Sequence, residues 1–125
     1  MKQFKLLREF CGKEIAALVI QVPGGIHISL YGGDLPHIGA VGIVDPTGGF
    51  SITQFPDHRE GILCKQYCAA LSKAGFCPAV VEAGIHYDKL DRDGISCVLS
   101  LTDEILNEIL RNLSEESNAT YGTHF

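Results

Sequence analysis

The sequence predicts an α+β fold, in which a largely antiparallel sheet of about seven strands carries two helices packed on one face. Apolar and polar residues alternate through the first half of the chain, between short turns that contain glycine or proline. Apolar residues recur at helical spacing in two later segments. The tight turns favour antiparallel pairing, since parallel strands need long crossover connections.

Size and composition indicate one domain. The chain has 125 residues, 46% of them hydrophobic, and no internal linker-like region. We expect a single α+β domain over residues 1–113, followed by a polar tail, 114–125, that we expect to be mobile.

The first half is expected to form five strands joined as an antiparallel meander, at Phe4–Glu9, Glu14–Val22, Ile26–Tyr31, Ile38–Val44 and Phe50–Phe55. The second of these is apolar on both faces, because Ile15, Ala17 and Val19 alternate with equally apolar neighbours. We therefore expect it to be an interior strand covered on both sides, by a helix, another sheet or a second subunit.

At Pro56 the apolar residues change from alternate positions to helical spacing, and a helix is expected from there. Asp57 and Glu60 have the spacing of a capping box, in which each side chain accepts a hydrogen bond from a first-turn N–H group. Leu63, Tyr67 and Leu71 then share one face, and Gly75 is well placed just beyond the end.

The remaining chain is expected to form two strands and a second helix. Ala79–Tyr87 and Ile95–Leu101 are the expected strands, separated by a charged loop. Ser100 to Asp103 offers caps for the helix, whose apolar stripe runs from Ile105 to Leu113.

The charge and the N-terminus exclude several classes of function. A net charge of −5 with no basic run makes nucleic acid an unexpected partner. The sequence shows neither a signal-peptide core nor an apolar run long enough for a bilayer, so we expect a cytoplasmic protein that does not bind membranes. The five cysteines are an odd count without a regular framework, which fits free thiols.

His37 is the first candidate for a functional site. It follows Gly32 and Gly33, whose N–H groups could be left open to a ligand oxygen, and Pro36 stiffens the chain before it. His37 could donate to an anionic or carbonyl oxygen, act as an acid or base, or bind a metal. The alternative is a turn histidine that bonds nearby backbone.

His58 and Arg59 are the second candidate, because a first helical turn favours an anion such as phosphate. Ordinary capping by Asp57 and Glu60 is the alternative. Glu82 and His86 are the third candidate; they lie on one strand face and could flank something that lies over Gly84, although a solvated outer face would look the same.

Other chemistry is weakly supported. The histidines at positions 37, 58 and 86 lack the spacing typical of a zinc site, and no metal ligand is assigned. Cys64 and Cys68 are expected to be small buried hydrophobic residues. The phosphate-binding glycine motifs and the serine nucleophile motif G-x-S-x-G do not occur.

Three motifs together resemble the LpdD-like family of prenylated-flavin chaperones, which accompany UbiD-type decarboxylases. They are Gly32-Gly33-Asp34-Leu35-Pro36-His37-Ile38-Gly39-Ala40, Pro56-Asp57-His58-Arg59-Glu60 and Gly84-Ile85-His86-Tyr87-Asp88. The resemblance covers roughly Tyr31 to Leu113. It departs at Asp57, where the family pattern has glycine, and a carboxylate there would repel a phosphate at the same helix end.

The resemblance implies a non-catalytic or weakly catalytic carrier that binds prenylated FMN, or FMN, and delivers it to a UbiD-type decarboxylase. A flavin prenyltransferase is a further partner, and self-association through the doubly apolar sheet is expected. The cofactor-binding residues would be Gly32, Gly33, His37, His58, Arg59, Glu82, His86 and Tyr87, with Tyr31 or Phe55 as other ring walls.

Two other functions remain open. One is a small enzyme, a hydrolase or lyase, that uses the three histidines with or without a metal. The other is an interaction subunit with no ligand.

Overall fold

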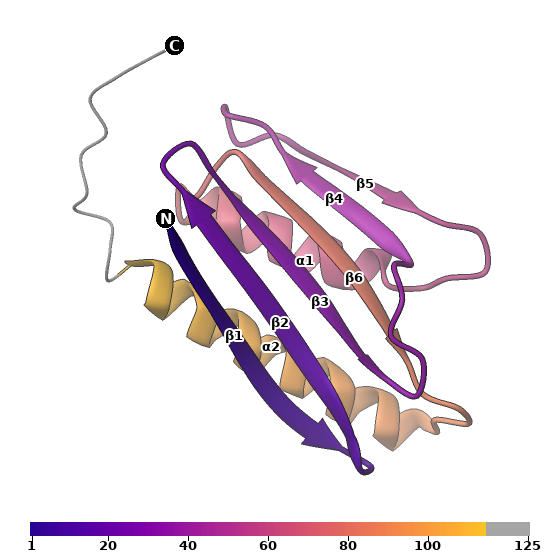
Figure 1. Ribbon diagram of the computed structural model, residues 1–125. Coiled ribbons are helices and arrows are strands. Elements are labelled where there is room, and N and C mark those ends of the chain that lie inside the picture. Colours follow the sequence, from indigo (N-terminus) through magenta and orange to yellow (C-terminus); the bar gives the residue numbers. More distant parts are fainter. Residues whose placement is uncertain (115–125) are drawn as a thin grey trace.

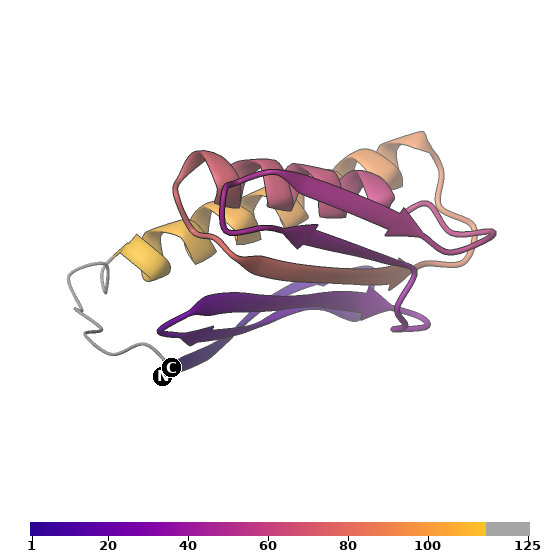
Figure 2. The ribbon, with the colours of Figure 1, turned by 90° about the horizontal axis from the view of Figure 1, so that it is seen from above.

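The computed structural model describes residues 1–114, which form a six-stranded sheet with two helices on one face (Figures 1 and 2). The strands are β1 (Lys2–Phe10), β2 (Lys13–Val22), β3 (Gly25–Gly33), β4 (Ala40–Val44), β5 (Phe50–Gln54) and β6 (Ala79–His86). The helices are α1 (Gly61–Lys73) and α2 (Arg92–Ser114). The predicted α+β class is confirmed.

The sheet order is β1-β2-β3-β6-β4-β5, with β3 and β6 parallel and every other neighbouring pair antiparallel. The predicted uninterrupted meander is therefore wrong at one point, because β6 lies between β3 and β4. The connection over residues 34–39 crosses the end of β6, whose carbonyl groups at His86 and Ala83 accept from the N–H groups of Asp34 and Gly39. This connection is longer than a two-residue hairpin loop. It spans the width of one strand, and β6 occupies that place between β3 and β4.

The predicted strand Ile95–Leu101 is also wrong, since it lies inside α2 and leaves six strands in place of seven. The Asp91 side chain accepts from the N–H group of Gly94 at 2.7 Å, which caps the helix a full two turns earlier than the sequence suggested. The buried residues of α2 continue one stripe at helical spacing: Gly94, Val98, Thr102, Ile105, Leu106, Ile109 and Leu113.

The start of α1 differs from the prediction. The helix begins at Gly61, and Asp57 has a φ of +64° in the turn before it. Glu60 is the residue at the helix start, but its side chain makes no cap bond within the helix, so the capping box does not form. At the other end Gly75 has a φ of +82° and follows the helix as predicted.

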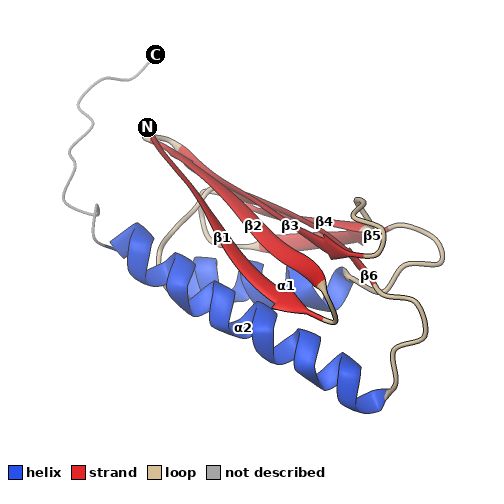
Figure 3. Cartoon of the chain, turned by 60° about the horizontal axis from the view of Figure 1, so that its bottom comes forward, coloured by secondary structure: helices blue, strands red, loops and turns tan. Residues whose placement is uncertain are grey.

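The core lies between the sheet and the two helices (Figure 3). The helix-facing residues of β2, Ile15, Ala17 and Val19, are fully buried. The Tyr67 hydroxyl of α1 donates to the Thr102 carbonyl oxygen of α2 at 2.5 Å and ties the helices together. The other face of the sheet, here called the open face, carries no helix within residues 1–114.

Within residues 1–114, neither helix is long and apolar enough to span a membrane. The tail predicted from position 114 lies outside the described residues, except for Ser114, which ends α2.

Candidate functional site

A pocket of about 730 Å³ opens where β6 ends and α1 begins. Three segments meet there: the β3–β4 connection, the turn before α1, and the end of β6 with the loop that leads to α2. The lining residues are Leu35, His37, Ile38, Asp57, His58, Arg59, Glu60, Ile85, His86, Tyr87, Lys89, Leu90 and Ile95. Five residues predicted from the sequence, His37, His58, Arg59, His86 and Tyr87, therefore come together.

The β3–β4 connection holds His37 firmly over β6. The N–H group of His37 donates to the Gly84 carbonyl oxygen at 3.4 Å. The carbonyl oxygen of His37 lies over Gly84, where a Cβ atom of residue 84 would stand. Its ring Nδ1 lies 2.8 Å from the Leu35 carbonyl oxygen, which can only accept a hydrogen bond. Nδ1 therefore carries a hydrogen, and Nε2 is directed away from this backbone contact.

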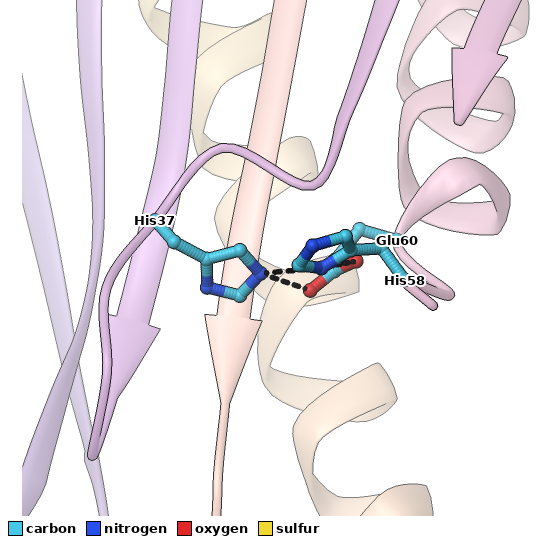
Figure 4. A group of neighbouring side chains, drawn as sticks. All are labelled: His37, His58 and Glu60. Carbon is cyan, nitrogen blue, oxygen red and sulfur yellow. Dashed lines mark hydrogen bonds and ion pairs between the residues drawn. The ribbon is translucent and has the colours of Figure 1, made fainter. Parts of the chain in front are cut away.

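Nε2 of His37 faces a carboxylate and a second histidine (Figure 4). Glu60 Oε1 lies 2.7 Å from it, and His58 Nδ1 lies 3.1 Å from it. The two rings are 4.8 Å apart between centroids, and His58 Nδ1 is 3.7 Å from Glu60 Oε2. These three side chains form a compact group at one wall of the pocket, here called the His-His-Glu cluster.

Glu60 is the cluster member that the sequence did not single out. Its side chain is only 9% exposed, and Oε2 accepts from the Arg59 N–H group at 3.0 Å. Gly39 makes room for it, because a Cβ atom there would collide with the carboxylate. In the sequence, Glu60 has the position of a capping residue. The only sequence feature that indicates its place in the cluster is Gly39, where the missing side chain lets another group come close to the backbone.

Two cations line the pocket. Arg59 comes from the turn before α1, and Lys89 from the loop after β6. Lys89 was not predicted, since its loop shows only ordinary charged residues. His86 also lines the pocket; its side chain is about half exposed, with Nε2 at 2.9 Å from Asp88 Oδ1.

An apolar extension of about 350 Å³ joins this pocket. It shares Arg59, Glu60, Ile85, Tyr87, Leu90 and Ile95 with the first pocket and continues between the helices along Ile62, Leu63, Val98 and Leu99. The site therefore combines a pocket with charged side chains and an adjoining apolar space, which is typical of pockets for cofactors with both kinds of group.

Tyr87 is fixed at the junction of the two spaces. Its ring meets Phe10 edge to face at 5.5 Å between centroids, and its hydroxyl donates to the Lys13 carbonyl oxygen at 3.4 Å. Burial raises the pKa of Tyr87 above its ordinary value, so the phenol stays neutral at physiological pH.

The other predicted residues lie outside the pocket. The backbone of Glu14 and Ile15 packs against Gly32, and that of His86 against Gly33, so these glycines are enclosed by β2 and β6. Glu82 lies on the open face, 3.5 Å from His27 Nε2. The space over Gly84 is filled by the chain's own His37 loop, so the expectation that a ligand lies there is wrong.

Neither Tyr31 nor Phe55 is among the residues that line the pocket. Lys5 lies over the Tyr31 ring, with Nζ 5.9 Å from its centroid, and Phe55 is 42% exposed.

Cys64 and Cys68 are fully buried in the core, as predicted. Burial raises the pKa of Cys64 to about 12 and that of Cys68 to about 11. Both thiols are therefore neutral at physiological pH and pack as small apolar groups.

Comparison with known proteins identifies a family. The family model described as a prenylated flavin chaperone LpdD-like domain matches residues 10–114, which include every residue of the pocket and its extension. No match to a curated protein was found.

Proposed function

Because the chain belongs to the prenylated flavin chaperone LpdD-like family, we propose that it binds prenylated FMN in this pocket and delivers it to a UbiD-type decarboxylase. The observation that carries the proposal is that a pocket lined by Arg59 and Lys89 adjoins an apolar space with which it shares several residues. A flavin mononucleotide needs both, because one end is a phosphate and the other a broad ring system.

Arg59 and Lys89 are the groups we assign to the phosphate. Both line the pocket, and a guanidinium can donate two parallel hydrogen bonds to phosphate oxygens. His86 lines the same pocket and adds a third donor. Asp57 opposes them, since its carboxylate lines the same space.

The apolar extension is the proposed place for the ring system. Ile62, Leu63, Val98 and Leu99 supply aliphatic walls, and Tyr87 supplies one aromatic edge. His37 and His58 line the charged pocket but not the extension, so they can meet polar atoms of the cofactor outside the apolar space. The proposed site does not include Gly32, Gly33 or Glu82. The two glycines pack against neighbouring strands, and Glu82 lies on the open face.

Delivery requires a pocket that opens without unfolding the core. The charged pocket is bordered by loops at the end of the sheet, and its extension reaches the edge of the core at Leu63 and Val98. The cofactor would be supplied by a flavin prenyltransferase and taken up by the decarboxylase.

Self-association is a second part of the proposal. The open face carries exposed aliphatic residues at Val22, Ile43 and Val80, and they border an apolar groove of about 290 Å³. A second copy of this chain that docks there would cover β2 on its second side.

A small histidine-dependent hydrolase or lyase is the alternative function, and the contact between His37 and Glu60 favours it. A histidine oriented by a buried carboxylate is a common acid–base arrangement. Such an enzyme would act without flavin and would lose its activity in His37→Ala.

Titration of reduced prenylated FMN and of FMN into the purified protein tests the site. Arg59→Ala should weaken binding by about tenfold or more, because a charged hydrogen bond contributes roughly 1.5–3 kcal/mol. Lys65→Ala is the matched control, since Lys65 is an exposed α1 residue that does not line the pocket. Equal affinities for Arg59→Ala and Lys65→Ala would contradict the proposed phosphate position.

A further inference from the structure

The geometry points to a site for a first-row divalent transition-metal ion, formed by His37 Nε2, His58 Nδ1 and the Glu60 carboxylate. One ligand atom from each of these residues lies within 4.8 Å of the other two. The site belongs to the chain itself and does not depend on whether the pocket binds flavin.

The separations between ligand atoms match those around one ion. Two ligands that each lie about 2.1 Å from a metal are about 3.0–3.4 Å apart at octahedral or tetrahedral angles. The observed separations are 2.7 Å from His37 Nε2 to Glu60 Oε1, 3.1 Å from His37 Nε2 to His58 Nδ1, and 3.7 Å from His58 Nδ1 to Glu60 Oε2. Each histidine therefore lies near the expected distance from one of the two carboxylate oxygens, so the set suits an ion held by both oxygens of Glu60, or by one of them after a side-chain rotation.

The hydrogen bonds leave His37 ready to ligate. Since Nδ1 donates to the Leu35 carbonyl oxygen, neutral His37 presents the lone pair of Nε2 toward Glu60. A lone pair and a carboxylate oxygen at 2.7 Å repel each other unless a cation lies between them. That cation is either a proton or a metal ion.

The surroundings favour a built site over a chance contact. The Leu35 carbonyl orients His37, as outer-shell partners commonly orient metal-binding histidines, and the Arg59 N–H group orients the nearly buried Glu60 carboxylate. Gly39 provides the space that the carboxylate occupies. All three ligands line the pocket, so the remaining coordination positions face it.

The ligand set indicates the class of ion. Two imidazoles and one carboxylate form the set found in many zinc sites and in facial-triad sites for iron and related metals. Magnesium and calcium, which prefer oxygen ligands, are not expected to bind.

The test is a titration of the flavin-free, chelator-treated protein with Co²⁺ alone and Zn²⁺ alone, followed by visible absorbance and calorimetry. One equivalent of Co²⁺ should bind with visible d–d bands, and Zn²⁺ should displace it. His58→Ala should weaken binding at least about tenfold. His58 is 35% exposed, so its removal should not unfold the chain, and circular dichroism checks this.

The chain offers a matched control in His27, which faces Glu82 on the open face at 3.5 Å. His27→Ala should leave metal affinity unchanged, and Glu60→Gln, which keeps the shape of the side chain, should weaken it. No stoichiometric binding, or equal losses in His58→Ala and His27→Ala, would overturn the proposal and leave His37 and Glu60 as a proton-bridged ion pair. Titration of flavin into the protein in the presence of a chelator tests the proposed flavin binding separately from metal binding.

Discussion

The carbonyl oxygen of His37 lies over Gly84, in the space that a Cβ atom at position 84 would need. This contact explains how a loop residue is held firmly enough to take part in a site. It also explains why β6 has a glycine between Ala83 and Ile85, since any side chain would push the loop away.

Gly84→Ala should therefore displace the His37 loop. We expect the free energy of unfolding to fall by about 1–3 kcal/mol, because a backbone carbonyl cannot move aside without shifting its loop. Flavin and metal affinity should fall with it. Gly24→Ala is the control, because a Cβ atom there meets nothing within 4 Å. Urea unfolding compares the two variants, and an unchanged Gly84→Ala stability would show that the loop does not depend on this contact.

Asp57→Gly should stabilise the protein. Asp57 has a φ of +64°, a left-handed conformation that favours glycine, so the substitution should add up to about 1 kcal/mol to the free energy of unfolding. Because the carboxylate leaves the pocket, FMN affinity should rise as well.

Asp57→Ala separates the two effects. It removes the same charge but keeps a Cβ atom at positive φ, so affinity should rise without the gain in stability. Equal stability of the glycine and alanine variants would contradict the conformational explanation.

Alkaline pH should destabilise the fold through Cys64 and Cys68. Burial raises their pKa values from an ordinary 9.0 to about 12 and about 11. Between pH 9 and these values the unfolded chain loses thiol protons that the folded chain keeps, so the free energy of unfolding should fall as pH rises above about 9. Urea unfolding at pH 7 to 10 measures the slope. Cys64→Ala should reduce it, whereas Cys97→Ser, at an exposed position, should not.

Ile43→Lys should disrupt self-association through the open face. Ile43 is 52% exposed and lies opposite Val80 in the ladder, so a lysine would bring a charge into the proposed interface. Light scattering coupled to gel filtration should show a smaller particle. Phe50→Lys is the control, because Phe50 is 40% exposed but shares the sheet face of buried Val44. A wild-type monomer would refute this part of the account.

The hairpins, the fold class and the end of α1 could be predicted because they depend on local signals. Alternation and turns specify β1 to β3, and Gly75 marks the helix end. The parallel pairing of β3 with β6 could not be predicted, since it joins segments that no local pattern relates. Residues 95–101 were ambiguous because a short apolar run suits a strand or a helix, and the Asp91 cap decides for the helix.

The sequence predicts several residues of the site, but it does not predict that they form a cluster. His37 and His58 each stood out beside a proline or a helix start, yet nothing in their spacing indicated that the rings meet. Glu60 was missed because its carboxylate serves His37 and the Arg59 N–H group, and makes no cap within α1.

Co-expression with a flavin prenyltransferase tests the central claim most directly. The absorbance spectrum and the mass of the small molecule that co-purifies should show one prenylated FMN per chain, and Arg59→Ala should lose it while Lys65→Ala keeps it. Colourless protein with no affinity for prenylated FMN or FMN would contradict the account and favour the histidine-dependent enzyme.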